Sequence, residues 1–196
     1  MKRIERTANK KYFRIKCLER IKKVRQHPNK YKKDKMVIDH LYQMIVANND
    51  RKIMLFLPLK GEVNIVPLIR RLRMQKRELY VPFMEGKSFR VVKYRLPLER
   101  KSFGTKEPKD SKQYRDKKID LAIVPIVGTD ITYRRVGFGK GMYDRFFEKE
   151  IKNIDKIVFV ARYLCYSRDV VTDSHDVTAD MLLTPQGISM KKSNTK

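Results

Sequence analysis

Apolar residues recur every three or four positions in four segments of the chain, and this spacing predicts four amphipathic helices. The first helix is expected near residues 6–26, where basic residues separate the apolar positions and Pro28 follows. The fourth covers residues 142–150, directly after a glycine-rich stretch. The apolar positions of the first three helices are Phe13, Cys17, Ile21 and Val24; Val37, Leu41, Met44 and Ile45; and Ile65, Leu68, Ile69 and Leu72.

Short apolar runs between these helices predict strands at residues 53–57, 79–81, 89–94, 121–127, 157–160 and 181–183. Strands that alternate with helices predict a single α/β domain, with a mostly parallel sheet and helices on both faces. We expect this domain to cover residues 1–186 and a basic C-terminal tail to cover residues 187–196. Residues 97–118 carry Pro, Gly and many charges, so they are expected to form a long functional loop with little regular structure.

The strand at residues 121–127 precedes a glycine-rich loop, Arg135-Val-Gly-Phe-Gly-Lys-Gly-Met-Tyr-Asp-Arg145, which leads into the fourth helix. Alternating glycines let backbone N–H groups approach an anion, and the helix N-terminus adds the positive end of its dipole. Lys140 adds a charge, and Asp144 in the first helical turn suits Mg²⁺ bound to phosphate. The loop matches neither the P-loop nor the Rossmann glycine pattern. The alternative is that the glycines only form a turn and Asp144 only favours the helix N-terminus.

The formal net charge of +25 is a competing signal, because a basic surface attracts nucleic acid and other polyanions without a specific site. Residues 1–35 hold fifteen Lys or Arg residues and three acidic ones. Such a segment is typical of a solvated helix face, and it also leaves open a basic protein that binds RNA or the ribosome. The chain lacks an aromatic RNA-binding pattern or a GXXG loop between helices, which weakens that alternative.

The two cysteines, Cys17 and Cys165, lie far apart without paired spacing, so we expect ordinary buried thiols in a reducing compartment and no zinc site. The three histidines form no metal-ligand pattern. The N-terminus lacks a signal-peptide core and no apolar run is long enough to span a membrane. The expected location is the cytoplasm, without a membrane partner.

The series from Asp120 to Pro125, with Asp130 and the loop from Arg135 to Asp144, resembles the signature of the 5-formyltetrahydrofolate cyclo-ligase family. The resemblance implies a Rossmann-like α/β fold, similar to that of coenzyme A transferases, whose glycine loop binds ATP. Lys10-Lys-Tyr-Phe-Arg14 resembles a family element that contacts ATP phosphates, and the spacing places Lys10 and Arg14 on one helical face. The implied ATP-binding residues are Lys10, Arg14, Arg135, Val136, Gly137, Phe138, Gly139, Lys140, Gly141, Met142 and Tyr143.

Three further segments match the family in its order along the chain. Leu57-Pro-Leu-Lys-Gly-Glu62 resembles the folate-contacting segment, which implies that Leu57, Glu62 and Tyr143 bind the substrate; Glu62 is also able to cap the following helix. Phe103-Gly-Thr-Lys-Glu-Pro108 resembles an element to which we assign no role. His175-Asp-Val-Thr-Ala-Asp180 resembles an element in which Asp180 is the second Mg²⁺ ligand beside Asp144, while Asp176 supports its loop by hydrogen bonding. An exposed acidic loop remains the alternative for both.

The implied activity is the Mg²⁺-dependent cyclisation of 5-formyltetrahydrofolate to 5,10-methenyltetrahydrofolate, with ATP as co-substrate and ADP and phosphate released. Lys140 and Arg135 are the implied catalytic residues, because phosphoryl transfer needs positive charge rather than a nucleophilic side chain. We expect a monomer whose folate substrate carries or lacks a polyglutamate tail. A sugar-phosphate or coenzyme A enzyme remains a further alternative, since a shared fold does not fix chemistry. The chain departs from the family pattern at Ile65, Thr129, Tyr133, Met142 and Cys165.

Overall fold

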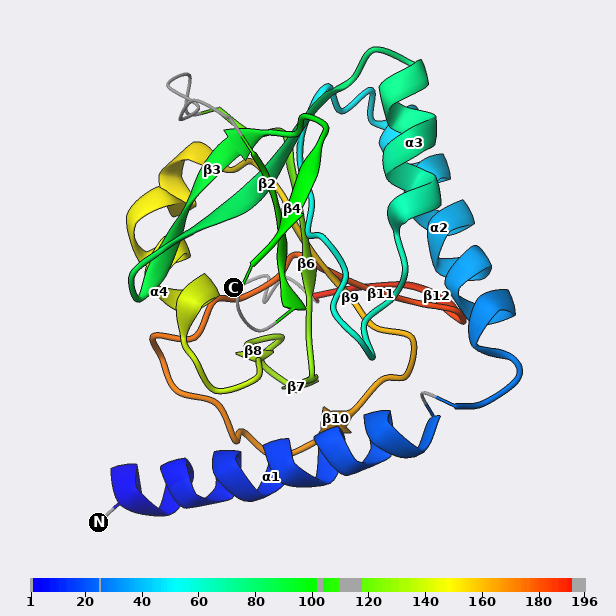
Figure 1. Ribbon diagram of the computed structural model, residues 1–196. Helices are drawn as coiled ribbons and strands as arrows, with labels where there is room; N and C mark the ends of the chain where they lie inside the picture. Colours follow the sequence, from blue (N-terminus) through cyan, green and yellow to red (C-terminus); the bar gives the residue numbers. More distant parts are fainter. Residues whose placement is uncertain (1, 25, 102–103, 110–117, 192–196) are drawn as a thin grey trace.

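The computed structural model describes residues 2–24, 26–101, 104–109 and 118–191 (Figure 1). Within these residues no helix combines the length and the apolar character that crossing a membrane requires. The helices are α1 (Lys2–Val24), α2 (Lys30–Ala47), α3 (Val66–Met74), α4 (Met142–Glu150) and the 3-10 helix η2 (Ile151–Asn153). The strands are β1 (Lys52–Met54), β2 (Glu78–Glu85), β3 (Ser88–Lys93), β4 (Leu98–Arg100), β5 (Lys106–Pro108), β6 (Leu121–Pro125), β7 (Gly128–Asp130), β8 (Arg135–Val136), β9 (Ile157–Val160), β10 (Tyr166–Ser167), β11 (Met181–Thr184) and β12 (Gly187–Met190).

A seven-stranded sheet forms the centre of the molecule, with the order β12-β11-β9-β6-β1-β2-β3. The five inner strands run parallel to one another, and the two edge strands pair antiparallel. Ile53 of β1 lies opposite Leu79 of β2 on one side and Leu121 of β6 on the other. The predicted mostly parallel α/β sheet is therefore confirmed. The carboxyl ends of its parallel strands all point to one edge, where such sheets bind ligands.

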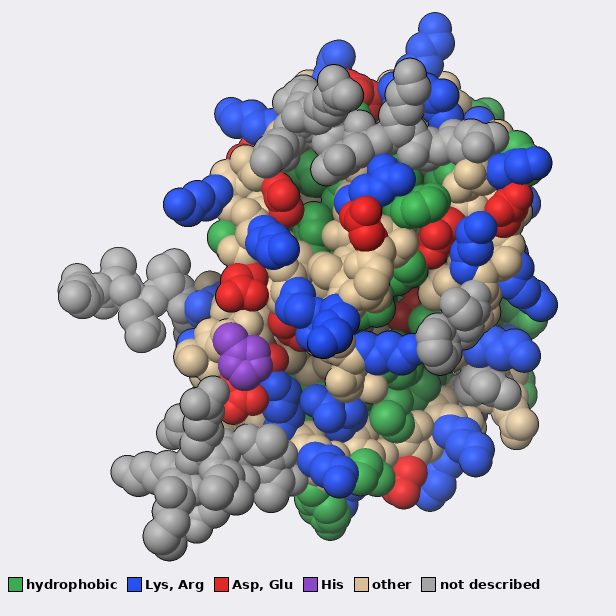
Figure 2. Space-filling view, turned by 60° about the vertical axis from the view of Figure 1, so that its left-hand side comes forward, with side chains coloured by type: hydrophobic (Ala, Val, Ile, Leu, Met, Phe, Trp, Pro, Cys, Tyr) green, Lys and Arg blue, Asp and Glu red, His purple; other side chains and the backbone are tan. Residues whose placement is uncertain are grey.

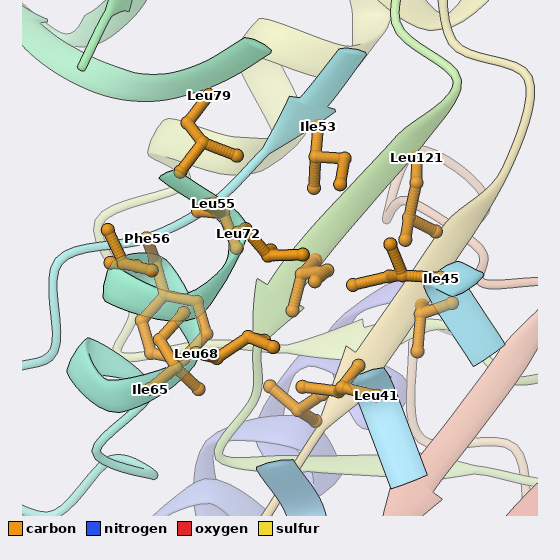
Figure 3. Packing of buried hydrophobic residues seen from close by; sticks show 14 of the residues in the cluster. Leu41, Ile45, Ile53, Leu55, Phe56, Ile65, Leu68, Leu72, Leu79 and Leu121 are labelled. Carbon is orange, nitrogen blue, oxygen red and sulfur yellow. The ribbon is translucent and has the colours of Figure 1, made fainter. Parts of the chain in front are cut away.

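Helices cover both faces of this sheet, as the sequence predicts (Figure 1). Residues of β1 alternate between the faces, so that Ile53 packs with α2 and α3 while Met54 lies in the cluster that contains Phe146 and Phe147 of α4. Figure 3 shows the first cluster, in which Leu41 and Ile45 of α2 and Leu68 and Leu72 of α3 approach side chains of the sheet. Close packing on both faces fixes the strands that carry the loops at the carboxyl edge.

Helix α1 lies across the carboxyl edge, beside the small sheet β10-β7-β8 (Figure 1). The prediction of two free thiols is wrong, because Cys17 of α1 forms a disulfide with Cys165, which lies just before β10. The bond links residues 148 positions apart. It also approaches Gly128 so closely that a Cβ there would lie 3.2 Å from the Cys17 sulfur and 2.8 Å from the Cys165 carbonyl oxygen. Sequence spacing does not reveal such a pair, since only the packing of α1 on this edge brings the cysteines together.

Three predicted boundaries differ from the structure. Residues 97–118 were expected to have little regular structure, and the described part contains two three-residue strands, β4 and β5, that pair antiparallel; residues 110–117 lie outside the described residues. The predicted tail begins with β12, which pairs with β11 and closes one edge of the sheet; residues 192–196 and Phe103 lie outside the described residues. Strand β2 continues through Pro82 because the proline nitrogen faces the side of β1, whose pairing with β2 ends at Tyr80.

Candidate functional site

The glycine-rich loop joins β8 to α4 at the carboxyl edge and requires glycine at particular positions. A Cβ on Gly137 would lie 2.2 Å from Nη1 of Arg135, so a larger residue would displace that guanidinium. Gly141 has a φ of 61° and immediately precedes α4, a conformation that favours glycine. The first N–H groups of α4 have no partner within the helix and, together with the helix dipole, favour an anion at this end.

Beside this loop lies a cleft of about 220 Å³ that gathers charged residues from four parts of the chain. It brings together six of the predicted ATP-binding residues and one predicted metal ligand. Figure 2 shows the molecule from the side of α4, where Lys and Arg side chains spread over the surface with a few acidic side chains between them. The residues that line the cleft are Lys10, Arg14, Arg135, Gly137, Gly139, Gly141, Asp144, Arg145, Glu148, His175 and Asp176.

Arg135 is a buried cation in this cleft. Its Nε donates a hydrogen bond to the Pro125 carbonyl oxygen at 3.1 Å, and its guanidinium carbon lies 4.5 Å from the centre of the Tyr143 ring. Among the described residues, no carboxylate lies within ion-pair distance of it. Burial lowers the pKa of Arg135, and the nearby Tyr143 and Asp144 oppose that shift. A buried charge without a direct ionic partner is costly, so this position favours binding of an anion.

Helix α1 supplies the two predicted phosphate contacts, which lie on its face toward the loop. Lys10 donates hydrogen bonds to Asp173 at 3.0 Å and to the two carboxylate oxygens of Asp176 at 2.5 and 2.7 Å. Arg14 donates from Nε to the Gly137 carbonyl oxygen at 2.9 Å. The predicted common face is confirmed, and these contacts dock α1 against both the glycine loop and the acidic loop that follows β10.

The two predicted metal ligands do not lie together. Asp144 is in the cleft, where it accepts a long hydrogen bond of 3.4 Å from the Val177 nitrogen. Asp180 lies at the amino end of β11, and its carboxylate accepts a hydrogen bond of 2.8 Å from the nitrogen of Ile157, the first residue of β9. Parallel strands place amino and carboxyl ends at opposite edges of the sheet, so Asp180 belongs to the edge away from the glycine loop.

Asp176 occupies the cleft in place of Asp180. It accepts a hydrogen bond from the Asp173 nitrogen at 2.8 Å, so its predicted support of the loop is confirmed. Ligand atoms of Asp173, His175 and Asp176 all lie within 4.8 Å of one another. Carboxylates are the ligands that Mg²⁺ prefers, and both Asp144 and Asp176 line the cleft.

Asp130 holds the start of the acidic loop that follows β10 and carries Asp173 and Asp176. Its carboxylate accepts hydrogen bonds from the Val171 and Thr172 nitrogens, each at 2.9 Å, and from the Thr172 hydroxyl at 2.6 Å. Burial alone would raise the pKa of Asp130, but the hydrogen bonds from Thr132 and Thr172 outweigh it and lower that pKa. An ionised Asp130 therefore fixes the start of the loop that presents Asp173 and Asp176.

Glu62 lines a second, much smaller cavity on the same edge of the sheet. The Leu59 nitrogen donates a hydrogen bond of 2.8 Å to its carboxylate, and burial of that carboxyl group raises the pKa of Glu62 to about 7. The cavity holds about 20 Å³, which is room for about one water molecule and far less than a pterin needs. Its walls include Ile21 and Val24 of α1, and Phe138 of the glycine loop.

The remaining predicted residues occupy different places around the two cavities. Phe138 has an exposed fraction of 43% and lines the Glu62 cavity, so the glycine loop contributes to both. Tyr143 packs edge-on against Phe89 with ring centres 5.0 Å apart, and burial raises its pKa. Leu57 packs against the core and is not among the residues that line the Glu62 cavity. Val136 is buried in β8, Met142 begins α4 and is half-buried, and the Lys140 side chain is exposed.

Sequence reasoning missed several residues of this region. Arg145, Glu148 and His175 line the cleft, and their signal was weak because charged residues are frequent throughout the chain. Arg162 follows the buried strand β9, and a polar residue at the carboxyl end of a buried strand was a usable signal. Tyr133, one of the positions that depart from the family pattern, adopts a φ of 58°, a backbone conformation that favours glycine.

Comparison with known proteins gives a consistent picture. Residues 6–185 match the model of the 5-formyltetrahydrofolate cyclo-ligase family. A 5-formyltetrahydrofolate cyclo-ligase from Haemophilus influenzae is 27% identical over 119 residues, which cover 57% of this chain and 64% of that protein. One from Mycoplasma pneumoniae is 24% identical over 136 residues, 69% of this chain and 74% of that protein. The solved structure of Aquifex aeolicus 5,10-methenyltetrahydrofolate synthetase superposes with a TM-score of 0.76, at 26% identity over 95% of both chains.

Proposed function

The chain belongs to the 5-formyltetrahydrofolate cyclo-ligase family, and we propose that it catalyses the ATP- and Mg²⁺-dependent cyclisation of 5-formyltetrahydrofolate. The products are 5,10-methenyltetrahydrofolate, ADP and phosphate. The observation that carries this proposal is the buried guanidinium of Arg135, which lies in the glycine-loop cleft and interacts electrostatically with both Asp144 and Glu62. Such a cation suits a reaction in which phosphoryl transfer and folate chemistry occur side by side.

The reaction begins when the oxygen of the N5-formyl group attacks the γ-phosphorus of ATP and ADP leaves. The phosphorylated formyl carbon is then attacked by N10 of the folate, N10 loses its proton, and the carbon–oxygen bond breaks to release phosphate. Both nucleophiles belong to the substrate, so the protein needs no nucleophilic side chain. Its contributions are positive charge around the phosphoryl group and alignment of the two ligands.

Positive charge comes from the residues around the glycine loop. Lys10 and Arg14 approach from α1 and bind phosphate oxygens, and Lys140 closes the loop over them. Arg135 neutralises negative charge on the transferring phosphoryl group, because a buried donor needs little reorganisation during the reaction. The backbone N–H groups of the loop bind the remaining oxygens, with Val136, Phe138, Met142 and Tyr143 shaping the surface against which the nucleotide lies.

Asp144 and Asp176 are the residues that would hold Mg²⁺, since both carboxylates line the cleft. When bound, the ion withdraws negative charge from the phosphate oxygens and orients them. Lys10 is ion-paired with Asp176, so Lys10 would have to leave this pair to bind a phosphate, and Asp176 would then be free to hold the metal. Asp180 has no part in this arrangement.

Glu62 accepts hydrogen bonds from the pterin amino and ring N–H groups, and it does so best when ionised. Leu57 and Tyr143 are the predicted apolar contacts of the same ligand. Because the cavity beside Glu62 is too small for a pterin, folate binding moves Phe138 or the end of α1 that carries Ile21 and Val24. The folate site therefore reaches its full size only when the substrate binds.

An absorbance assay for methenyltetrahydrofolate tests the proposal. The chain is incubated with 5-formyltetrahydrofolate and Mg²⁺, with and without ATP, while ADP release is measured in parallel. We expect product only with ATP, at one ADP per methenyl group. RNA binding that weakens steeply with salt, without ATP turnover on 5-formyltetrahydrofolate, would instead support the basic-protein alternative. ATP hydrolysis that does not depend on the folate would contradict the proposed reaction.

A further inference from the structure

Arg162 and Asp34 form a buried ion pair next to the Glu62 cavity. Arg162 follows β9, and Asp34 lies in the first turns of α2. The pair is bidentate, with Nε of Arg162 2.6 Å from one carboxylate oxygen of Asp34 and Nη2 2.8 Å from the other. Each side chain has an exposed fraction of 8%, so both charges are largely removed from water.

The same two residues hold the turn that carries Glu62. Nη2 of Arg162 donates a hydrogen bond of 2.6 Å to the Glu62 carbonyl oxygen, and Nη1 is 3.4 Å from the Gly61 carbonyl oxygen. Asp34 accepts a hydrogen bond of 3.3 Å from the Asn64 nitrogen on the other side of the turn. The pair therefore joins α2, the end of β9 and both flanks of Glu62.

We propose that Arg162 and Asp34 are positioning residues that hold the Glu62 turn in the geometry needed to bind the pterin of the folate substrate. This inference rests on the proposed function. Neither residue was predicted from sequence motifs, and neither touches the reacting atoms. Arg162 lines the Glu62 cavity, but its guanidinium is engaged by Asp34 and by the backbone of the turn.

Stability alone does not account for this arrangement. A buried ion pair costs desolvation, and replacement by a well-packed apolar pair is often neutral or stabilising, so such a pair is better explained by the geometry that it fixes. Arg is suited to that task because its planar fork binds one carboxylate with two N–H groups and still has N–H groups for the carbonyl oxygens of the turn. The pair is also neutral overall. A neutral pair has little effect on the charge of Glu62. The pKa of Glu62 is accordingly raised by burial, with smaller opposing effects of the Leu59 nitrogen and Arg135.

The chain contains a second ion pair that serves as a matched control. Lys156 precedes β9 and lies 2.7 Å from Asp50, which precedes β1; the Asp50 side chain is 3% exposed. Both residues lie at the amino edge of the sheet, away from Glu62 and the glycine loop. A change at Asp50 therefore perturbs a buried carboxylate of similar kind without acting on the folate turn.

The test compares Arg162→Lys and Asp34→Glu with the control Asp50→Glu. Each substitution keeps the charge, so no buried ion is left without a partner, but the first two shift the turn. We expect the KM for 5-formyltetrahydrofolate to rise by about 10- to 100-fold in Arg162→Lys and Asp34→Glu, the range known for groups that orient the ligands of a metal. The KM for ATP should change by less than about threefold, because uniform nucleotide binding is untouched. Asp50→Glu should leave both constants near the native values.

The outcomes separate this inference from the proposed function. A native chain that makes no methenyl product overturns the proposed function and this inference with it. The positioning role alone is overturned if the native chain is active and one of two results appears. Either Arg162→Lys and Asp34→Glu have the same KM for 5-formyltetrahydrofolate as Asp50→Glu, or their KM for ATP rises as much as their KM for the folate. If Arg162→Lys does not fold, Asp34→Glu is the deciding variant, since it leaves Arg162 unchanged and alters only the length of the carboxylate side chain that holds the guanidinium and the Asn64 nitrogen.

Discussion

The glycine-loop cleft and the Glu62 cavity lie at the same edge of one sheet but are built differently. The cleft has about 220 Å³ and is lined by charged side chains and three glycines, whereas the cavity has about 20 Å³ and apolar walls from α1 and the glycine loop. The cleft persists because its glycines have no side chains to fill it and because Lys10 and Asp176 are held in an ion pair. In the cavity beside Glu62, by contrast, apolar side chains pack against one another, since burial of apolar surface is favourable. The space of the cleft is thus formed by the chain itself, whereas the cavity beside Glu62 is largely filled by apolar side chains.

Removal of Arg135, which lines the cleft and interacts electrostatically with Glu62, should have the largest effect. Arg135→Gln keeps much of the side-chain volume but removes this buried charge. We expect kcat to fall by about 10³-fold, the upper range for one lost electrostatic donor. Steady-state assay of methenyl product checks this. If the loss appeared in KM for ATP alone, Arg135 would be a binding residue of the cleft and not a group that serves both regions.

Lys140→Ala should impair only the nucleotide half. We expect a loss of about 10²-fold in kcat, because the loop then contributes its amides without the additional charge. Lys149→Ala is the matched control, since Lys149 is exposed on α4 and does not line the cleft. Equal activity of the two variants would remove Lys140 from the phosphate site.

Asp144→Asn should raise the Mg²⁺ concentration needed for half-maximal activity by about 10- to 100-fold, through loss of a charged ligand. Asp176→Asn should act in the same direction. Asp180→Asn should leave the metal dependence unchanged, because Asp180 is bonded to Ile157 at the opposite edge. Magnesium titrations of the three variants decide between these positions, and a response of Asp144→Asn and Asp180→Asn without one of Asp176→Asn would restore the ligand set that the family resemblance implied.

Glu62→Gln should have the smallest effect on turnover, with a rise of about tenfold in KM for 5-formyltetrahydrofolate from the loss of a charged hydrogen-bond acceptor. It should also change stability with pH. The folded-state pKa of about 7 exceeds the ordinary value of 4.5. Protonated Glu62 therefore contributes its full stability below about pH 4.5, and this is lost as pH rises toward 7.

Relative to the native chain, Glu62→Gln should gain stability as pH rises over this window, by a total of about 3 kcal/mol. Denaturant unfolding of both proteins at pH 5 and pH 8 measures the difference. A stability difference that is independent of pH would mean that the Glu62 carboxyl group is solvated in the folded protein.

Local patterns predicted much of this molecule. The helical spacing of Phe13, Cys17 and Ile21 identified α1, and the apolar run before the glycine loop identified β6, because both elements repeat one physical environment along the sequence. The glycine loop was also readable, since its backbone demands are local. The match of Lys10 and Arg14 to one helical face followed from spacing alone.

Contacts between distant segments were not readable. The disulfide of Cys17 and Cys165 depends on how α1 lies across the sheet, and no spacing rule specifies that. Asp176 and Asp180 are only four residues apart, but the segment between them crosses from one edge of the sheet to the other. Which of the two carboxylates lies in the cleft therefore depends on the fold and not on the local sequence. Arg162 acquires its role only when β9, α2 and the Glu62 turn meet.

The central claim is that ATP lies in the glycine-loop cleft with its γ-phosphate beside Arg135 and with the pterin against Glu62. A crystal structure with a non-hydrolysable ATP analogue, Mg²⁺ and 5-formyltetrahydrofolate measures this directly. We expect the γ-phosphate within hydrogen-bond distance of Arg135, the ion on Asp144 and Asp176, and a Glu62 cavity enlarged by movement of Phe138 or α1. A triphosphate bound elsewhere, with this cleft closed in the ternary crystal, would contradict the account.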